Sequence, residues 1–450
     1  MAKYKAYPEY KDSGVEWLGK VPNHWEILSA KRMFQSVRTP AYKSDEQLAA
    51  SQKYGVIPQS LMMQLNDSKV MLALKGTESF RHVEANNFVI SLRSFEGGIE
   101  YSQYTGCVSP AYTVLKNSKP ISYGYYRYLL KCTPFIAALQ SSTDSLRDGK
   151  SINYEQFSAL SLPLSSVQEQ NVIAAFLDHE TAKIDKLFEK QQQLIELLKE
   201  KRQAVISHAV TKGLNPDVPM KDSGVEWLGE VPEHWEVKKL KHVAHIIDCK
   251  NRTPEYFDDG EYLVVRTTNV KKQSLVLDDA LYTNERDFKI WTERGVPPVG
   301  SILFTREAPA GEICIVPAFT KLCMGQRMMN FICHQSNYTN FLFDYLTSDC
   351  LKRYIESEAA GSTVSHLRVE QVYNIPIVIP PNSEQKNIDE MVGVMKAQYS
   401  RLIDDAECSL VLLQERRNAL ISAAVTGKID VRDWVAPDTK DIEEPEETTA

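Results

Sequence analysis

Two arginines at the ends of short apolar runs are the side chains of this sequence best placed to bind a ligand. Ile90–Leu92 precedes Arg93, and Leu303–Thr305 precedes Arg306, and a turn containing glycine follows in each case. Because its donors form a rigid fork, an arginine at such a turn can hydrogen-bond both O6 and N7 of guanine. The same pattern in both halves of the chain favours binding over catalysis.

Further polar residues lie after Arg93 in the first half of the chain and on both sides of Arg306 in the second. Hydroxyl and amide side chains suit phosphate oxygens or base edges. Any one of these residues is also explained as an ordinary surface-loop residue, but their grouping favours contact with DNA. The candidate DNA-binding residues are Arg93, Ser94, Ser142, Thr143, Arg147, Lys150, Arg266, Thr268, Asn269, Arg306, Gln326, Arg327, Ser362, Thr363 and His366.

Motifs that would indicate catalysis are missing from the sequence. The segment 144–151 resembles a phosphate-binding loop at Gly149-Lys150-Ser151, but it lacks the first glycine and does not join an apolar strand to a helix. An Asn-Pro-Pro-Tyr motif, a Gly-x-Ser-x-Gly elbow and a His-Glu-x-x-His pair are all absent. The eight cysteines form no C-x-x-C pair, which is evidence against a zinc site. We therefore predict a non-catalytic chain without a metal or cofactor of its own.

Length and composition are those of a globular protein with at least two domains. The chain has 450 residues, of which 43% are hydrophobic and 25% charged. The N-terminus has no apolar signal region, and no stretch reaches the roughly 18–20 apolar residues of a membrane helix. We expect a cytoplasmic protein that does not contact membranes.

Charge is unevenly distributed along the chain. The net charge is −7, and the segment 438–450 holds six acidic residues against Lys440. This acidic, aromatic-free tail is predicted to be disordered. The remainder is close to neutral, so DNA binding would require local basic surface or basic surface from a partner.

An internal repeat organises the whole sequence. Residues 11–27 and 221–237 are identical at fourteen of seventeen positions, at an offset of 210. Residues 200–211 and 415–426 match at eight of twelve positions, at an offset of 215. The segments between these pairs align poorly. The copied parts thus form a common frame, whereas the two inserts have diverged.

Each copy ends in a segment with the pattern of a long helix. In the first, Ser166 and Glu169 form a capping box, and Gly213 follows the end; in the second, Asn382 and Gln385 are the cap. Their apolar residues recur in heptads, which predicts two antiparallel helices paired as a coiled coil. The predicted stripes are Ile184, Leu187, Phe188, Leu194, Ile195, Leu198 and Val205, and Tyr399, Leu402, Ile403, Leu410, Leu413 and Leu420.

The sequence patterns of the two inserts predict mixed α/β domains. Strands are predicted at 87–92, 262–266 and 301–305, and helices at 123–140 and 340–359. The predicted class is α+β: two such domains separated by two long antiparallel helices, with pseudo-two-fold symmetry. The predicted boundaries are 1–27 (first block), 28–165 (first domain), 166–212 (first helix), 213–237 (second block), 238–380 (second domain), 381–428 (second helix) and 429–450 (acidic tail).

From about residue 8 to 434 the chain resembles the specificity subunits of type I restriction–modification systems. The resemblance lies in both copies of DSGVEWLGxVPxHWE, in the Gly-Ser-Thr patch at 361–363 before a strand, and in the segment from Glu169 to Gly213. It implies that each insert is a target recognition domain that reads one half of a bipartite DNA site. It also implies that the long helices set the distance between the half-sites.

The resemblance further implies which partners the chain has. Two adenine methyltransferase subunits carrying S-adenosylmethionine and two restriction–translocase subunits using ATP and Mg²⁺ would assemble with it on double-stranded DNA. The methyltransferase subunits would dock on the repeated blocks and helices. The candidate partner-binding residues are Trp17, Trp25, Trp227, Trp235, Arg202 and Arg417.

Two other interpretations remain open from the sequence. A coiled-coil scaffold without a DNA role would explain the helices, but not the diverged arginine-bearing domains. An enzyme would require methyltransferase or nuclease activity in the chain itself, although its motifs are missing.

Overall fold

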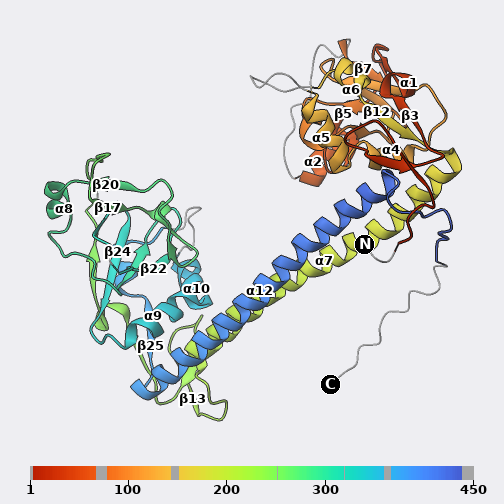
Figure 1. Cartoon of the computed structure of the whole chain (residues 1–450). Helices are drawn as coiled ribbons and strands as arrows, with labels where there is room; N and C mark the ends of the chain where they lie inside the picture. Colours follow the sequence, from red (N-terminus) through yellow and green to blue (C-terminus); the bar gives the residue numbers. More distant parts are fainter. Residues whose placement is uncertain are drawn as a thin grey trace. The chain divides into compact units, whose positions relative to one another are not determined.

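The structure is a computed structural model that describes residues 4–66, 79–142, 152–250, 252–318, 320–358 and 366–437 (Figure 1). The chain divides into two compact units, Met1–Gln191 with Cys408–Ala450, and Gln192–Glu407. The acidic tail 438–450 lies outside the described residues.

The first unit contains the first block and the first insert. Its strands are β1 (Tyr10–Asp12), β2 (Lys20–Pro22), β3 (Glu26–Ser29), β4 (Phe34–Val37), β5 (Leu48–Ser51), β6 (Gly55–Pro58), β7 (Arg81–Val83), β8 (Phe88–Ile90), β9 (Glu100–Tyr101), β10 (Gly106–Val108), β11 (Thr113–Asn117) and β12 (Ser161–Leu164). Its short helices are α1 (Ala30–Met33), α2 (Gln59–Asn66), α3 (Ser94–Gly97), α4 (Tyr123–Leu129), α5 (Thr133–Ser141) and α6 (Tyr154–Ala159).

The second unit contains the second block and the second insert. Its strands are β13 (Met220–Asp222), β14 (Glu230–Pro232), β15 (Glu236–Lys239), β16 (Ala244–Asp248), β17 (Tyr262–Val265), β18 (Val270–Lys271), β19 (Ser274–Leu275), β20 (Leu281–Thr283), β21 (Ile302–Thr305), β22 (Ile313–Ile315), β23 (Leu322–Met324), β24 (Met328–Cys333) and β25 (Pro376–Ile379). Its short helices are the 3₁₀ turns η2 (Leu240–His242) and η3 (Thr267–Asn269), with α8 (Glu285–Trp291), α9 (Tyr338–Thr347), α10 (Asp349–Glu358) and α11 (Val369–Tyr373).

The repeated sequence forms the same frame in both units. A two-stranded hairpin opens each copy, β1–β2 in the first and β13–β14 in the second. The next strand pairs antiparallel with the strand that precedes the long helix, β3 with β12 and β15 with β25. The insert between them therefore begins and ends on adjacent strands, so it can vary while the frame stays closed.

The inserts are built around four-stranded sheets. The order is β4-β11-β8-β9 in the first unit and β16-β24-β21-β22 in the second, where a three-stranded sheet, β20-β17-β23, is added. The strands predicted at 87–92, 262–266 and 301–305 correspond to β8, β17 and β21. These elements confirm the α+β class.

Each helix predicted inside an insert is two helices in the structure. The range 123–140 contains α4 and α5, because Pro134 in the first turn of α5 has no N–H with which to continue the preceding helix. The range 340–359 contains α9 and α10. Ser348 between them is extended, and its hydroxyl accepts a hydrogen bond from the Cys350 N–H at 3.3 Å, which starts α10 anew.

Two helices, α7 (Val167–Lys212) and α12 (Asn382–Val425), are far longer than the others, at 46 and 44 residues. At 1.5 Å per residue, α7 is about 69 Å long. In the first unit, Asp185 of α7 pairs with Arg417 of α12, and Phe176 packs on Trp434, which follows α12. From the first contact to the second, the residue number falls from 185 to 176 in α7 while it rises from 417 to 434 in the partner segment. The two segments therefore run antiparallel in this unit.

The buried seam of the long helices is narrower than predicted. Ile184, Ile195, Ile403 and Leu420 are at most 8% exposed. Leu187, Leu194 and Leu402, which the predicted stripes included, are 50%, 43% and 43% exposed. The stripes counted two adjacent heptad positions as core, whereas a two-helix seam buries a strict 3-then-4 spacing.

Candidate nucleic-acid interface

Strand register brings most of the second insert's candidates to one sheet edge. The strands β17 and β23 run parallel and end together at Val265 and Met324, so Arg266 and the turn Gly325–Arg327 leave the same edge. The strands β21 and β24 are antiparallel neighbours, with Thr305 opposite Met328. Arg306 follows Thr305 and Arg327 precedes Met328, so the two arginines lie next to each other just beyond the end of this strand pair.

Backbone hydrogen bonds fix the residues of this edge. The Arg306 N–H donates to the Arg327 carbonyl at 2.8 Å, and the Leu367 N–H donates to the Arg306 carbonyl at 3.0 Å. Glu307 forms an isolated antiparallel bridge with His366. The structure therefore brings together Arg306, Arg327 and His366, which are far apart in the sequence. We call Arg306, Glu307, Arg327 and His366 the second-domain edge.

The arginines of this region differ in exposure. Arg306 is only 9% exposed, and its Nε has no hydrogen-bond partner among the described residues. Arg266 is half-buried and donates from Nη2 to the Asp279 carbonyl at 2.7 Å. Thr268, Gln326, Arg327 and His366 are exposed. The region thus combines the buried Arg306 and the half-buried Arg266 with four exposed polar side chains.

Two predicted DNA contacts have structural roles instead. Asn269 is 1% exposed; its side chain accepts from the Arg266 N–H at 3.0 Å and donates to the Val276 carbonyl at 3.1 Å. Ser94 is also 1% exposed, and its hydroxyl accepts from the Ser91 N–H at 2.8 Å. Both side chains close tight turns, so neither is available to DNA, and the prediction for them is wrong.

In the first insert the two remaining described candidates, Arg93 and Ser142, lie far apart along the chain. Arg93 is exposed and directly precedes α3. Ser142 is half-buried, and its hydroxyl donates to the Leu139 carbonyl at 2.7 Å at the end of α5. The other predicted residues, Thr143, Arg147 and Lys150 here and Ser362 and Thr363 in the second insert, lie outside the described residues.

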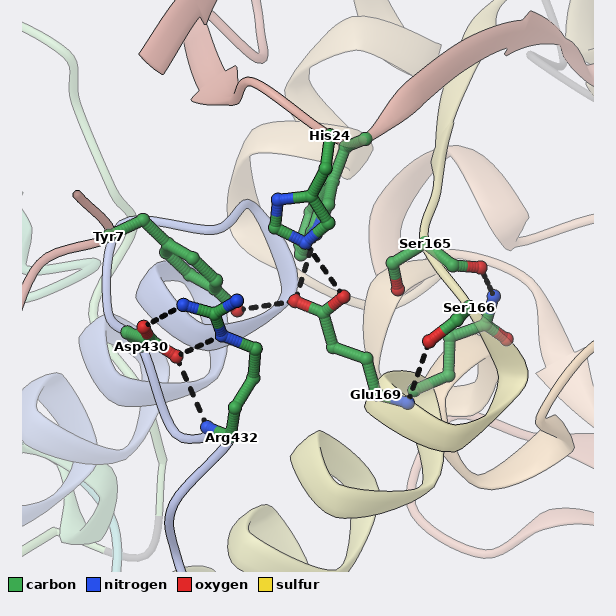
Figure 2. A network of polar contacts seen from close by, with 9 residues as sticks. Tyr7, His24, Ser165, Ser166, Glu169, Asp430 and Arg432 are labelled. Carbon is green, nitrogen blue, oxygen red and sulfur yellow. Dashed lines mark hydrogen bonds and ion pairs between the residues drawn. The ribbon is translucent and has the colours of Figure 1, made fainter. Parts of the chain in front are cut away.

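A buried carboxylate joins the first block to the start of α7 (Figure 2). Glu169 Oε1 accepts hydrogen bonds from the Trp25 indole at 3.0 Å and the Tyr7 hydroxyl at 2.8 Å, and Oε2 lies 2.9 Å from His24 Nε2. One half of the predicted capping box is present, since the Ser166 hydroxyl accepts from the Glu169 N–H at 3.2 Å, whereas the Glu169 carboxylate binds the first block instead of the Ser166 N–H. Burial and the adjacent Glu169 carboxylate raise the pKa of the Tyr7 hydroxyl far above its usual value.

The second copy repeats the central part of this cluster. The Trp235 indole donates to Glu384 at 2.9 Å, and His234 Nε2 lies 2.6 Å from the same carboxylate. Sequence analysis missed Glu384 and gave Glu169 only a capping role. The signal was present, because the His-Trp pairs and the two glutamates all occupy matching places in the repeat.

The predicted partner contacts fall into two groups. Trp25 and Trp235 are fully buried, so their side chains belong to the core, and the prediction of a partner contact is wrong for them. The others are not fully buried: Trp17 packs on Phe135, Trp227 packs on Tyr354, Arg417 binds Asp185 at 2.9 Å, and Arg202 is half-buried.

Among the described residues, no three His, Cys, Asp or Glu side chains are grouped so as to hold a metal ion. None of the helices in this part of the chain combines the length and the apolar character needed to span a membrane.

Comparison with known proteins supplies the family context. The family model described as "Type I restriction modification DNA specificity domain" matches residues 232–393. The type I restriction enzyme MjaVIII specificity subunit of Methanocaldococcus jannaschii is 24% identical over 92% of this chain and 95% of its own length. The EcoKI specificity subunit of Escherichia coli K12 is 20% identical over 93% of this chain and 92% of its own length.

Solved structures share the fold. A chain from a study of "complex assembly and conformational transition of the type I R-M system" matches with a TM-score of 0.65 and 13% identity, covering 91% of this chain and 99% of that one. The HsdS subunit of Thermoanaerobacter tengcongensis matches with a TM-score of 0.50 and 14% identity, covering 91% and 98%. Residues 232–393 thus match the type I restriction–modification DNA specificity domain, and nearly the whole chain is similar in sequence to type I specificity subunits.

Proposed function

We propose that this chain is the DNA specificity subunit of a type I restriction–modification complex. Each insert reads one half of a bipartite site in double-stranded DNA, and α7 and α12 set the number of base pairs between the halves. The observation that carries the proposal is the contrast between a repeated frame and two diverged inserts. A duplicated frame with different readers suits a site made of two unrelated half-sites.

Catalysis in this proposal belongs to partner subunits. Two adenine methyltransferase subunits with S-adenosylmethionine and two restriction–translocase subunits with ATP and Mg²⁺ would complete a cytoplasmic complex. Support comes from the names of the relatives, which are specificity subunits, and from the missing catalytic motifs. The methyltransferase subunits are proposed to dock on the repeated blocks and the long helices, near Trp17, Trp227, Arg202 and Arg417.

Net charge bears on how such a complex would hold DNA. With a formal charge of −7, the chain alone offers few uncompensated cations for phosphates, and we propose that the partner subunits supply much of the phosphate contact. The arginines of the second-domain edge would then serve base recognition, because hydrogen bonds to base edges specify sequence whereas phosphate contacts position the protein.

Selection from a randomised duplex pool tests this function. The full chain, assembled with its methyltransferase subunits, should enrich a bipartite consensus with two defined halves and an undefined gap of fixed length. The chain alone should show a shallower dependence of affinity on salt than the assembled complex. A coiled-coil scaffold without DNA recognition would enrich no sequence, and a single contiguous consensus would contradict the two-reader arrangement.

A further inference from the structure

The second-domain edge carries an ion pair that the proposed function does not yet use. Arg327 Nε lies 3.0 Å from Glu307 Oε2, and the two side chains are 51% and 29% exposed. Both backbones are fixed, Arg327 by the Arg306 N–H and Glu307 by its bridge to His366. The second-domain edge therefore holds the Arg327 guanidinium, a donor, next to the Glu307 carboxylate, an acceptor. Both side chains are partly exposed, so a ligand can reach them.

The backbone at Arg327 favours a role for its side chain outside the fold. Its φ of +66° lies in the left-handed region, which glycine adopts with much less strain than an arginine. Strained backbone of this kind tends to occur at functional sites. A glycine would satisfy the turn between β23 and β24 more easily, so the fold does not explain the long charged side chain at this position.

A second guanidinium, that of Arg306, belongs to the same edge. Arg306 is 9% exposed, and its Nε lacks a hydrogen-bond partner among the described residues. A buried cationic donor without a partner favours an acceptor-rich surface next to it. The edge is therefore better suited to a ligand rich in acceptors than to another basic surface.

We propose that Glu307 and Arg327 read a G·C base pair in the half-site of the second insert, an inference that rests on the proposed function. In the major groove a G·C pair presents N7 and O6 acceptors on guanine, followed by the N4 donor on cytosine. The Arg327 fork matches the two acceptors, and the neighbouring Glu307 carboxylate matches the donor. Because the Glu307 carboxylate lies 3.0 Å from Nε of Arg327, the Nη groups of the guanidinium would form the fork, with the carboxylate held beside them.

An A·T pair fits the same side chains less well. Its major-groove edge alternates an acceptor, a donor and an acceptor before the thymine methyl group. The two donors of an arginine fork would then meet one acceptor and one donor. Because one hydrogen bond of the fork would be lost, the pair should discriminate G·C from A·T.

The test compares three variants by selection from a randomised duplex pool, using the full chain assembled with its methyltransferase subunits. Arg327→Gly relieves the left-handed strain, and Glu307→Gln keeps the shape, so both should fold, which thermal unfolding checks. Each should lose the preference for G·C at the same single position of one half-site, by about 5- to 150-fold. The other half-site should remain unchanged.

Glu285→Gln is the matched control. Glu285 pairs with Lys289 on α8 at 2.9 Å, and α8 packs on Tyr262 at the opposite end of β17 from Arg266. This variant should keep the wild-type consensus. A folded Arg327→Gly or Glu307→Gln complex with an unchanged consensus would overturn the inference and leave the proposed function intact. A wild-type complex that enriches no sequence would overturn the proposed function itself.

Discussion

At the scale of residues, one glutamate per copy holds the repeated block on its long helix. Glu169 is 6% exposed and is contacted by Tyr7, His24 and Trp25. Glu384 is contacted only by His234 and Trp235 among the described residues, and its side chain is 37% exposed. Hydrogen bonds to a buried charge are stronger than those in solvent, so the two glutamates should differ in their contribution to stability.

Glu169→Gln should destabilise the first block much more than Glu384→Gln destabilises the second. An amide places donors where Tyr7, Trp25 or His24 already donate, and we expect a loss of about 2–3 kcal/mol in local stability against about 1 kcal/mol for Glu384→Gln. Hydrogen–deuterium exchange of residues 10–29 and 220–239 measures each block separately. If Glu169→Gln and Glu384→Gln each sped up exchange in their own block by the same factor relative to wild type, the predicted difference between the two glutamates would be contradicted.

A second buried carboxyl predicts how stability depends on pH. Burial raises the pKa of Glu100 to about 7 from a usual value of 4.5, although Lys131 lies 2.7 Å away and opposes the rise. Since the folded state then binds the proton more tightly than the unfolded state, the contribution of Glu100 to stability is fully present below about pH 4.5 and is lost as pH rises through about 7. The total change is at most about 3.5 kcal/mol, at about 1.4 kcal/mol per pKa unit.

Glu100→Gln should remove this slope from the first unit. Urea midpoints of wild type and variant, measured between pH 5 and 8, give the difference directly. The Glu84→Gln variant is the control, because Glu84 pairs with Lys116 on the surface and the hydrogen bond lowers the pKa of its carboxyl. A wild-type slope that persists in Glu100→Gln would assign the pH dependence to another group.

At the scale of elements, the repeat and the capping signals predicted the two long helices, but their heptads were assigned too broadly. The seam could not be read from α7 alone, because Leu194 and Ile195 are adjacent apolar residues and only the position of α12 decides which is buried. The ends of α4 and α9 could have been predicted from the sequence, because Pro134 and Ser348 are local helix-breaking or helix-capping residues. The second-domain edge could not, because it depends on the register of β17 with β23 and of β21 with β24.

Ile195→Ala and Leu194→Ala test the seam. Ile195 is 5% exposed and Leu194 is 43% exposed. We expect Ile195→Ala to lower the free energy of unfolding by about 2 kcal/mol or more, and Leu194→Ala to lower it by about 0.5 kcal/mol or less, because only the first leaves a cavity. Urea unfolding of the full chain, followed by circular dichroism at a helix wavelength, checks this order. A reversed order would mean that the wrong heptad positions have been placed in the core.

At the scale of the whole molecule, the frame and the inserts have different tasks. The block hairpins, the β3–β12 and β15–β25 pairs and the glutamate clusters recur in both copies. The inserts share a four-stranded antiparallel sheet with the same strand order, but the strands added around it differ, and among the described residues the three-stranded sheet occurs only in the second insert. Such a division predicts that an insert can be exchanged without disturbing the frame.

Exchange of the first insert tests this central claim most directly. Residues 28–165 are replaced by the corresponding insert of a related specificity subunit, and the chain is expressed with its methyltransferase subunits in a host that lacks this methylation. Sequencing of methylated adenines should then reveal a bipartite motif in which one half is new, while the other half and the gap length are those of the wild type. A motif with both halves changed, or with neither changed, would contradict the account.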